Sequence, residues 1–101
     1  MTVLMTLRVR GDASKIEELA AESPGTLQTI VERAKEHGVI SHRFYGNDEE
    51  VLVVDEWPSE EAFQAFFAAS PDIGEVMQRA GVTSEPQITF WRKLDSKDDV
   101  G

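Results

Sequence analysis

The feature that most restricts the fold is a short apolar run, VLVV at residues 51–54, with polar sequence on both sides. The turn-forming residues GNDEE precede it, and Asp55, Glu56 and Pro58 follow it. A strand whose consecutive residues are all apolar is typical of a sheet that is covered on both faces. The run therefore predicts a central strand over residues 50–57, in a fold with more than one layer.

Three further segments have the pattern of strands, at residues 3–9, 39–45 and 87–94. The first of them is almost as apolar as VLVV, whereas the other two carry several charged and polar side chains. A central strand needs apolar residues on both of its faces, and an edge strand does not. We therefore expect the first and third strands to be central and the second and fourth to lie at the edges.

Two helical regions, at residues 13–38 and 59–81, separate these strands. A Ser-Pro pair interrupts each region, at residues 23–24 and 70–71. In both places we expect the serine to cap a new helix and the proline to occupy its first position. The resulting order, β-α-β-β-α-β, is that of the ferredoxin-like α+β fold. It predicts a four-stranded antiparallel sheet in the order 4-1-3-2, with the helices on one face.

Composition excludes several classes of partner. The 101 residues include 19 acidic and 10 basic side chains, a net charge of −9, which repels nucleic acids and anionic membranes. The chain has no cysteine, and its two histidines lack metal-binding spacing, so we expect no metal and no cofactor. No apolar run approaches the ~18 residues of a spanning helix. We expect a cytoplasmic protein with one domain at residues 1–94 and a charged tail at residues 95–101.

The two apolar strands also predict an assembly. Two helical regions can cover only one face of a four-stranded sheet, and large exposed apolar patches are rare on soluble monomers. A second copy of the sheet, packed face to face, would cover the other face. We therefore expect a homodimer.

Trp57 ends the third strand and leaves two interpretations open. Its ring either packs over the helix start beside Pro58 and Phe63, as a hydrophobic staple, or forms the wall of a pocket for a flat ligand. In either case we expect Trp57 to be mostly buried.

The polar residues near Trp57 are equally open. Asp55 and Glu56 point to opposite faces by strand alternation, so they cannot form a paired-carboxylate site, and we expect both to be partly exposed. Asp55 either pairs with Arg8 or Arg43, or faces an apolar pocket as a general base. His42 is either a half-buried, hydrogen-bonded structural group or a catalytic one.

Residues 50–73 carry a more specific pattern, a hydrophobic strand followed by Trp, one residue, Ser, acidic residues and an Ala-Phe pair. These positions are Trp57, Ser59, Glu60, Glu61, Ala62 and Phe63. The segment resembles the antibiotic-biosynthesis-monooxygenase-like family, and the rest of the chain resembles it in topology. The resemblance implies a dimeric α/β barrel.

This family includes cofactor-independent, quinone-forming oxygenases and haem-degrading enzymes. The haem-degrading members pair the Trp with a His on the second helical region and an Asn on the first strand. Here these positions fall near 75–77, where there is no His, and near Thr6. Haem degradation is therefore disfavoured.

The resemblance implies a cofactor-independent monooxygenase that acts on a flat aromatic or polyketide-like substrate, with His42 or Asp55 as the base. The residues expected to contact the substrate are Trp57, Phe44, Phe63, Phe67 and Thr6. The alternative is a non-catalytic dimer that binds a small ligand or stabilises a partner. An open cleft with a titratable group favours the enzyme, and a cleft filled by Phe63, Phe66, Phe67 and Trp91 favours the alternative.

Overall fold

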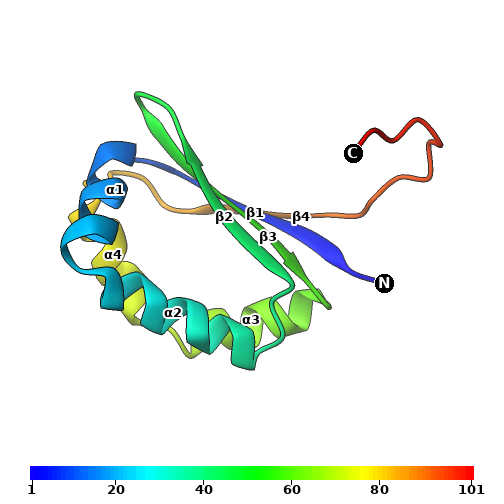
Figure 1. Ribbon diagram of the computed structural model, residues 1–101, viewed down its shortest axis with the longest axis horizontal. Coiled ribbons are helices and arrows are strands. Elements are labelled where there is room, and N and C mark those ends of the chain that lie inside the picture. Colours follow the sequence, from blue (N-terminus) through cyan, green and yellow to red (C-terminus); the bar gives the residue numbers. More distant parts are fainter.

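The structure is a computed structural model that describes residues 1–101. Its elements are β1 (Val3–Arg10), α1 (Ala13–Glu22), α2 (Pro24–Glu36), β2 (Ser41–Gly46), β3 (Glu50–Trp57), α3 (Glu60–Ala68), α4 (Asp72–Arg79) and β4 (Gln87–Trp91). Each predicted helical region is thus two consecutive helices (Figure 1). None of these helices has the length and apolar character needed to cross a bilayer.

The four strands form one antiparallel sheet in the order β2-β3-β1-β4. This order confirms the predicted 4-1-3-2 arrangement and the ferredoxin-like α+β fold. All four helices lie on the same side of the sheet (Figure 1). The apolar strands β1 and β3 are central, as their two apolar faces require.

The edge strands are shorter than the sequence indicated. β4 was expected to reach residue 94 and ends at Trp91, which pairs with Leu4. Because β1 begins at Val3, a longer β4 would have almost no partner residues left. β2 was expected from residue 39 and begins at Ser41. Residues 92–101 leave the sheet as exposed chain without helix or strand (Figure 1).

The helix starts follow the capping prediction only in part. Ser59, where the second helical region begins, accepts a hydrogen bond from the backbone N–H of Ala62 at the start of α3. Ser23 occupies the N-cap position of α2, with Pro24 next, but its side chain makes no capping bond. The expected cap by Ser70 was wrong. Its buried hydroxyl instead donates to the carbonyl of Phe66 (2.7 Å), near the C-terminal end of α3.

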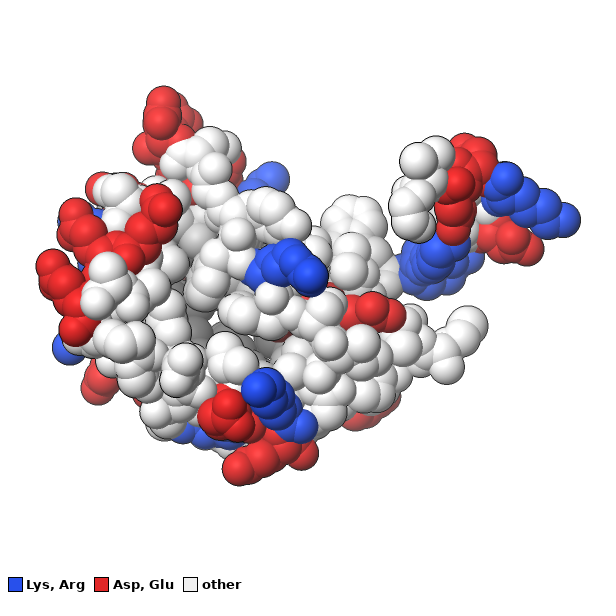
Figure 2. Space-filling model, viewed as in Figure 1, with Lys and Arg blue, Asp and Glu red and all other residues white.

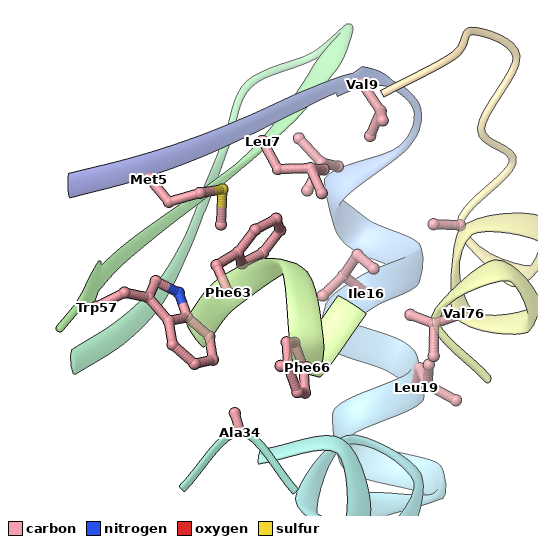
Figure 3. Packing of buried hydrophobic residues seen from close by; sticks show 12 residues of the cluster. Met5, Leu7, Val9, Ile16, Leu19, Ala34, Trp57, Phe63, Phe66 and Val76 are labelled. Carbon is pink, nitrogen blue, oxygen red and sulfur yellow. The ribbon is translucent and has the colours of Figure 1, made fainter. Parts of the chain in front are cut away.

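The hydrophobic core lies between the sheet and the helices (Figure 3). Its twelve buried apolar residues are Met5, Leu7, Val9, Ile16, Leu19, Ala34, Val51, Trp57, Phe63, Phe66, Val76 and Ala80. Trp57 is completely buried and packs against the rings of Phe63 and Phe66, with centroid distances of 5.7 and 5.3 Å. The prediction that Trp57 is buried and anchors Phe63 is therefore confirmed.

The opposite side of the sheet, called here the outer face, has no helix over it (Figure 1). Strand alternation directs a mixture of apolar and polar side chains to it. The apolar members are Leu4, Tyr45, Leu52, Val54 and Trp91. Leu4, Tyr45 and Trp91 are exposed, and Leu52 and Val54 are half-buried.

Candidate functional site

A cavity of about 100 Å³ lies between the sheet and the helical layer. Strands β1, β2 and β3 and all four helices contribute to its wall. Nineteen of its 21 lining residues are hydrophobic, and the other two are His42 and Asp55. In Figure 2 a recess opens between the strands and the helices, bordered by uncharged residues. The cavity is therefore apolar except where His42 and Asp55 line it.

The pairing of β2 with β3 brings these two polar residues together. His42 lies directly opposite Asp55 in the antiparallel register, and both side chains point toward the helices. His42 Nδ1 lies 2.7 Å from Asp55 Oδ1. Residues directly opposite each other in such a pair are close enough for their side chains to interact.

Trp57 forms a hydrogen bond with the other oxygen of the Asp55 carboxylate. Its indole Nε1–H donates to Asp55 Oδ2 at 3.1 Å. Trp57 lies two residues after Asp55 in β3, on the same face of the sheet, and is fully buried. Asp55 is only 4% exposed, yet both of its oxygens have a donor. This satisfies the requirement that a buried carboxylate be hydrogen-bonded.

Two expectations about Asp55 were wrong. It was expected to be partly exposed, and one interpretation paired it with Arg8 or Arg43. Alternation places both arginines on the outer face, whereas Asp55 faces the helices. Arg8 instead pairs with Glu50, at 3.3 Å. Asp55 therefore has His42 and Trp57 as its hydrogen-bond partners, and no Lys or Arg.

The arrangement fixes the imidazole of His42. An ionised carboxylate only accepts hydrogen bonds, so Nδ1 must carry the proton that points to Asp55. The neutral ring then presents the lone pair of Nε2, the form in which a histidine acts as a general base. The His42 side chain is 28% exposed, and its ring lies edge-on to Phe44, with a centroid distance of 5.0 Å. Orientation by a buried acid and partial access are what a base needs.

The remaining predicted site residues divide into three groups. Phe44, Phe63 and Phe67 line the cavity together with His42 and Asp55. Trp57 lies behind Asp55, outside the lining, where it packs in the core. Thr6 points to the outer face and accepts a hydrogen bond from Trp91 Nε1 at 2.9 Å. The structure thus separates Thr6 from the cavity.

Sequence reasoning missed the far wall of the cavity. It is built by Leu27, Ile30 and Val31 of α2 and by Ile73, Val76 and Met77 of α4. Their spacing predicted apolar helix faces, but such spacing is the same whether a face packs tightly or borders a cavity. Of the aromatic residues expected to fill the cleft in a binding protein, Trp91 lies on the outer face. Phe63, Phe66 and Phe67 line the cavity and leave it open.

A second polar cluster joins α2 to α4 outside the cavity. Arg33 donates to both oxygens of Asp72, at 2.7 and 3.1 Å, and to the hydroxyl of Ser70. The hydrogen bond from Arg33, helped by its charge, lowers the pKa of the Asp72 carboxyl, while burial acts in the opposite direction. This bridge holds together the two helices that form the far wall.

The structure shows no cluster of side chains arranged to bind a metal ion. No group of three or more His, Asp or Glu side chains is arranged to hold one. The second histidine, His37, lies at the C-terminal end of α2, and its Nδ1 is 3.0 Å from the carbonyl oxygen of Arg33. His37 therefore caps the end of its own helix and does not line the cavity.

Sequence comparison identifies neither a matching family model nor a matching curated protein. Comparison of structures does find similar proteins. Rv0793 from Mycobacterium tuberculosis aligns over 97% of this chain and 100% of its own, with a TM-score of 0.62 and 16% identity. A crystal structure described as an antibiotic biosynthesis monooxygenase aligns over 91% and 98%, with a TM-score of 0.61 and 10% identity.

SnoaB from Streptomyces nogalater, described as a cofactor-independent oxygenase, is also similar. It aligns over 97% of both chains, with a TM-score of 0.59 and 10% identity. The TM-scores and the coverage show a common fold over almost the whole length, at low sequence identity. The resemblance to the antibiotic-biosynthesis-monooxygenase-like family is thus confirmed at the level of the fold.

Proposed function

We propose that this chain is a cofactor-independent monooxygenase that oxidises a flat, phenol-like aromatic or polyketide-like substrate in the cavity between sheet and helices. The observation that carries the proposal is the hydrogen-bonded pair of His42 and Asp55, the only polar groups among 21 lining residues. A titratable pair in an apolar cavity is the usual mark of an active site. The likeness in fold to SnoaB supports the same reaction class.

Each residue of the pair has a distinct role in this proposal. His42 Nε2 removes the proton from the substrate hydroxyl. Asp55 holds the imidazole in the required tautomer and stabilises the imidazolium that forms. Trp57 holds the second oxygen of Asp55, so the carboxylate cannot rotate away from His42. Phe44, Phe63 and Phe67 contact the substrate ring through stacked or edge-on packing.

The reaction needs no cofactor because the deprotonated substrate is itself the reductant. The electron-rich phenolate carbanion transfers an electron to dioxygen, and the two radicals couple to form a carbon–oxygen bond at the ring. The ring carbon then loses its hydrogen as a proton, and the oxygen–oxygen bond breaks to give a quinone carbonyl. The second oxygen atom leaves as water, with one hydrogen from the hydroxyl and one from the ring carbon. Each turnover consumes one dioxygen and one phenol and releases one quinone and one water.

Oxygen uptake with a panel of phenols and hydroxylated polycyclic aromatics tests the proposal. The wild-type chain should consume dioxygen and form quinone in equal amounts, and His42→Ala should lose about 100-fold or more, the usual contribution of a general base. Asp55→Asn should also be slow, because the amide can hold the wrong tautomer. The matched control is His37→Ala, which removes the other histidine, outside the cavity, and should retain activity.

A non-catalytic binding protein of the same fold is the competing function. It predicts that an aromatic ligand binds with a defined stoichiometry while dioxygen is not consumed. That combination, observed for every ligand that binds, would refute the oxygenase.

We also propose that the protein is a homodimer, in which the outer faces of the two sheets pack against each other. The apolar residues on that face support it, because Leu4, Tyr45 and Trp91 are exposed in the single chain. A stable interface buries more than ~1,200 Å² in total. Sedimentation at micromolar concentration should give about twice the monomer mass of 11.3 kDa. Leu52→Lys, at the centre of the outer face, should give monomers, whereas Gln28→Lys on α2 should not. The cytoplasmic location stays a prediction from the sequence.

A further inference from the structure

We propose that the substrate is a neutral, single-ring phenol with an apolar substituent, and not a fused-ring or carboxylated aromatic. This inference rests on the proposed function, because it concerns the substrate of the same site. Three features of the cavity carry it: its volume, the number of its polar groups and its charge.

The volume limits the number of rings. An engineered protein cavity of about 150 Å³, lined by Leu, Ile and Phe, binds one benzene molecule. The present cavity, at about 100 Å³, has a similar lining and is smaller. One ring therefore fits after a small outward movement of a wall residue such as Phe44, which is 37% exposed. A second fused ring would exceed this volume, so it would have to extend through the opening of the cavity or displace wall residues.

The polar groups limit the number of polar substituents. Both oxygens of Asp55 have a donor and Asp55 is only 4% exposed, so Nε2 of the more exposed His42 is the most accessible polar position in the wall. It can serve a single hydroxyl. Any further polar substituent would be buried among 19 hydrophobic residues without a partner. Such a group weakens binding by roughly 10-fold or more.

The charge of the site excludes anions. No Lys or Arg lines the cavity, and the one carboxylate in its wall, Asp55, is buried. Arg33, on the helical layer, is already occupied by both oxygens of Asp72. The chain as a whole carries a net charge of −9. Acidic side chains also gather over the helices in Figure 2. A substrate carboxylate would therefore meet repulsion on approach and have no counter-ion after binding.

Phe67 sets the size limit on the α3 side. It lines the cavity, is half-buried and stacks on Phe63 with a centroid distance of 5.4 Å. Phe63 in turn contacts Trp57, so it cannot be shortened without loss of core packing. The ring of Phe67 pairs with Phe63 and not with His42, and it takes no part in the hydrogen bonds of Asp55. Its truncation should widen the cavity and leave the polar pair in place.

Isothermal titration of the full chain under anaerobic conditions tests the inference, because binding is then measured without turnover. The probes are 4-ethylphenol, 4-hydroxyphenylacetate and 1-naphthol. The first should bind at least about 10-fold more tightly than either of the others. Phe67→Ala should bind 1-naphthol about 10-fold or more tightly than the wild-type chain does. Phe67→Leu should also bind 1-naphthol more tightly than the wild-type chain, by a smaller factor. It replaces the alanine variant in this test if that variant does not fold.

The outcomes separate this inference from the proposed function. Equal or tighter binding of 4-hydroxyphenylacetate or 1-naphthol, or no binding of 4-ethylphenol, would overturn the inference. So would an unchanged 1-naphthol affinity in a folded Phe67 variant. Tight and selective binding of 4-ethylphenol without oxygen uptake in air would support the inference and refute the oxygenase. Oxygen uptake only with fused-ring substrates would do the reverse.

Discussion

Replacement of Trp57 separates the packing role of its ring from the role of its hydrogen bond. Trp57→Ala removes a fully buried ring that contacts Phe63 and Phe66, and it leaves Asp55 Oδ2 without a donor. Trp57→Phe keeps one six-membered ring in the core and removes the indole N–H together with the five-membered part of the ring system. The two variants therefore differ mainly in the cavity that they create.

The magnitudes follow from these losses. Truncation of a buried Trp to Ala costs about 3–5 kcal/mol, and loss of a hydrogen bond to a charged group about 1.5–3 kcal/mol. Trp57→Ala should therefore cost at least about 3 kcal/mol, out of the roughly 5–15 kcal/mol that stabilises a domain. Trp57→Phe should cost about 1.5–3 kcal/mol. The neighbouring control Glu56→Gln should stay within about 0.5 kcal/mol, because Glu56 makes only an exposed hydrogen bond with Thr2.

Urea unfolding followed by circular dichroism measures all three variants, at one protein concentration so that any dimer affects them equally. A Trp57→Phe variant as stable as the wild-type chain would refute the importance of the bond to Asp55. A stable Trp57→Ala variant that no longer binds ligand would show that the ring is a pocket wall and not a core residue.

Other predictions concern the bridge between α2 and α4 and two glycines. Because Arg33 lowers the pKa of Asp72 in the folded state, the bridge stabilises the fold above the unfolded-state pKa of about 3.9, and this is lost as the pH falls through the lower folded-state value. Asp72→Asn should cost about 0.5–1 kcal/mol at pH 7 and weaken the loss of stability below about pH 4, measured by urea unfolding at each pH. A stability difference independent of pH would contradict this. Gly46→Ala should cost about 1–3 kcal/mol, since the new Cβ would lie 2.4 Å from Ala13 Cβ, whereas Gly74→Ala in α4 has open space and should gain about 0.5–1 kcal/mol. Thermal melts compare the two, and equal midpoints would refute the contact with Ala13.

The hydrophobic patterns of the strands were sufficient to predict most of the fold. The continuous apolar run at 51–54 and the alternation at residues 3–9 identified the central strands, and the polar second and fourth segments identified the edges. Edge-strand ends were less predictable, because they depend on how far the neighbouring strand extends. The capping error at Ser70 has a similar cause. Its hydroxyl could accept from a backbone N–H of α4 or donate to a carbonyl of α3, and the sequence does not show which hydrogen bond forms.

The polar pair was within reach of the sequence but was not identified as a pair. Alternation correctly placed Asp55 and Glu56 on opposite faces of the sheet. The missing information was the register between β2 and β3, which depends on the turn at residues 47–49. Without the register, an arginine was the natural partner for a strand carboxylate. The cavity itself depends on the distance between α2 and the sheet, which side-chain volumes at many positions set together.

The tautomer of His42 decides whether the proposed base exists, because Nε2 is free to accept a proton only if Asp55 holds the other proton on Nδ1. Long-range ¹⁵N–¹H correlation spectra of the ¹⁵N-labelled chain at alkaline pH distinguish the two neutral tautomers. His42→Gln assigns the signals, and His37 supplies an internal comparison. His42 should have the Nδ1–H form in the wild-type chain and lose it in Asp55→Asn. A His42 ring in the Nε2–H form, or one unchanged by Asp55→Asn, would contradict it.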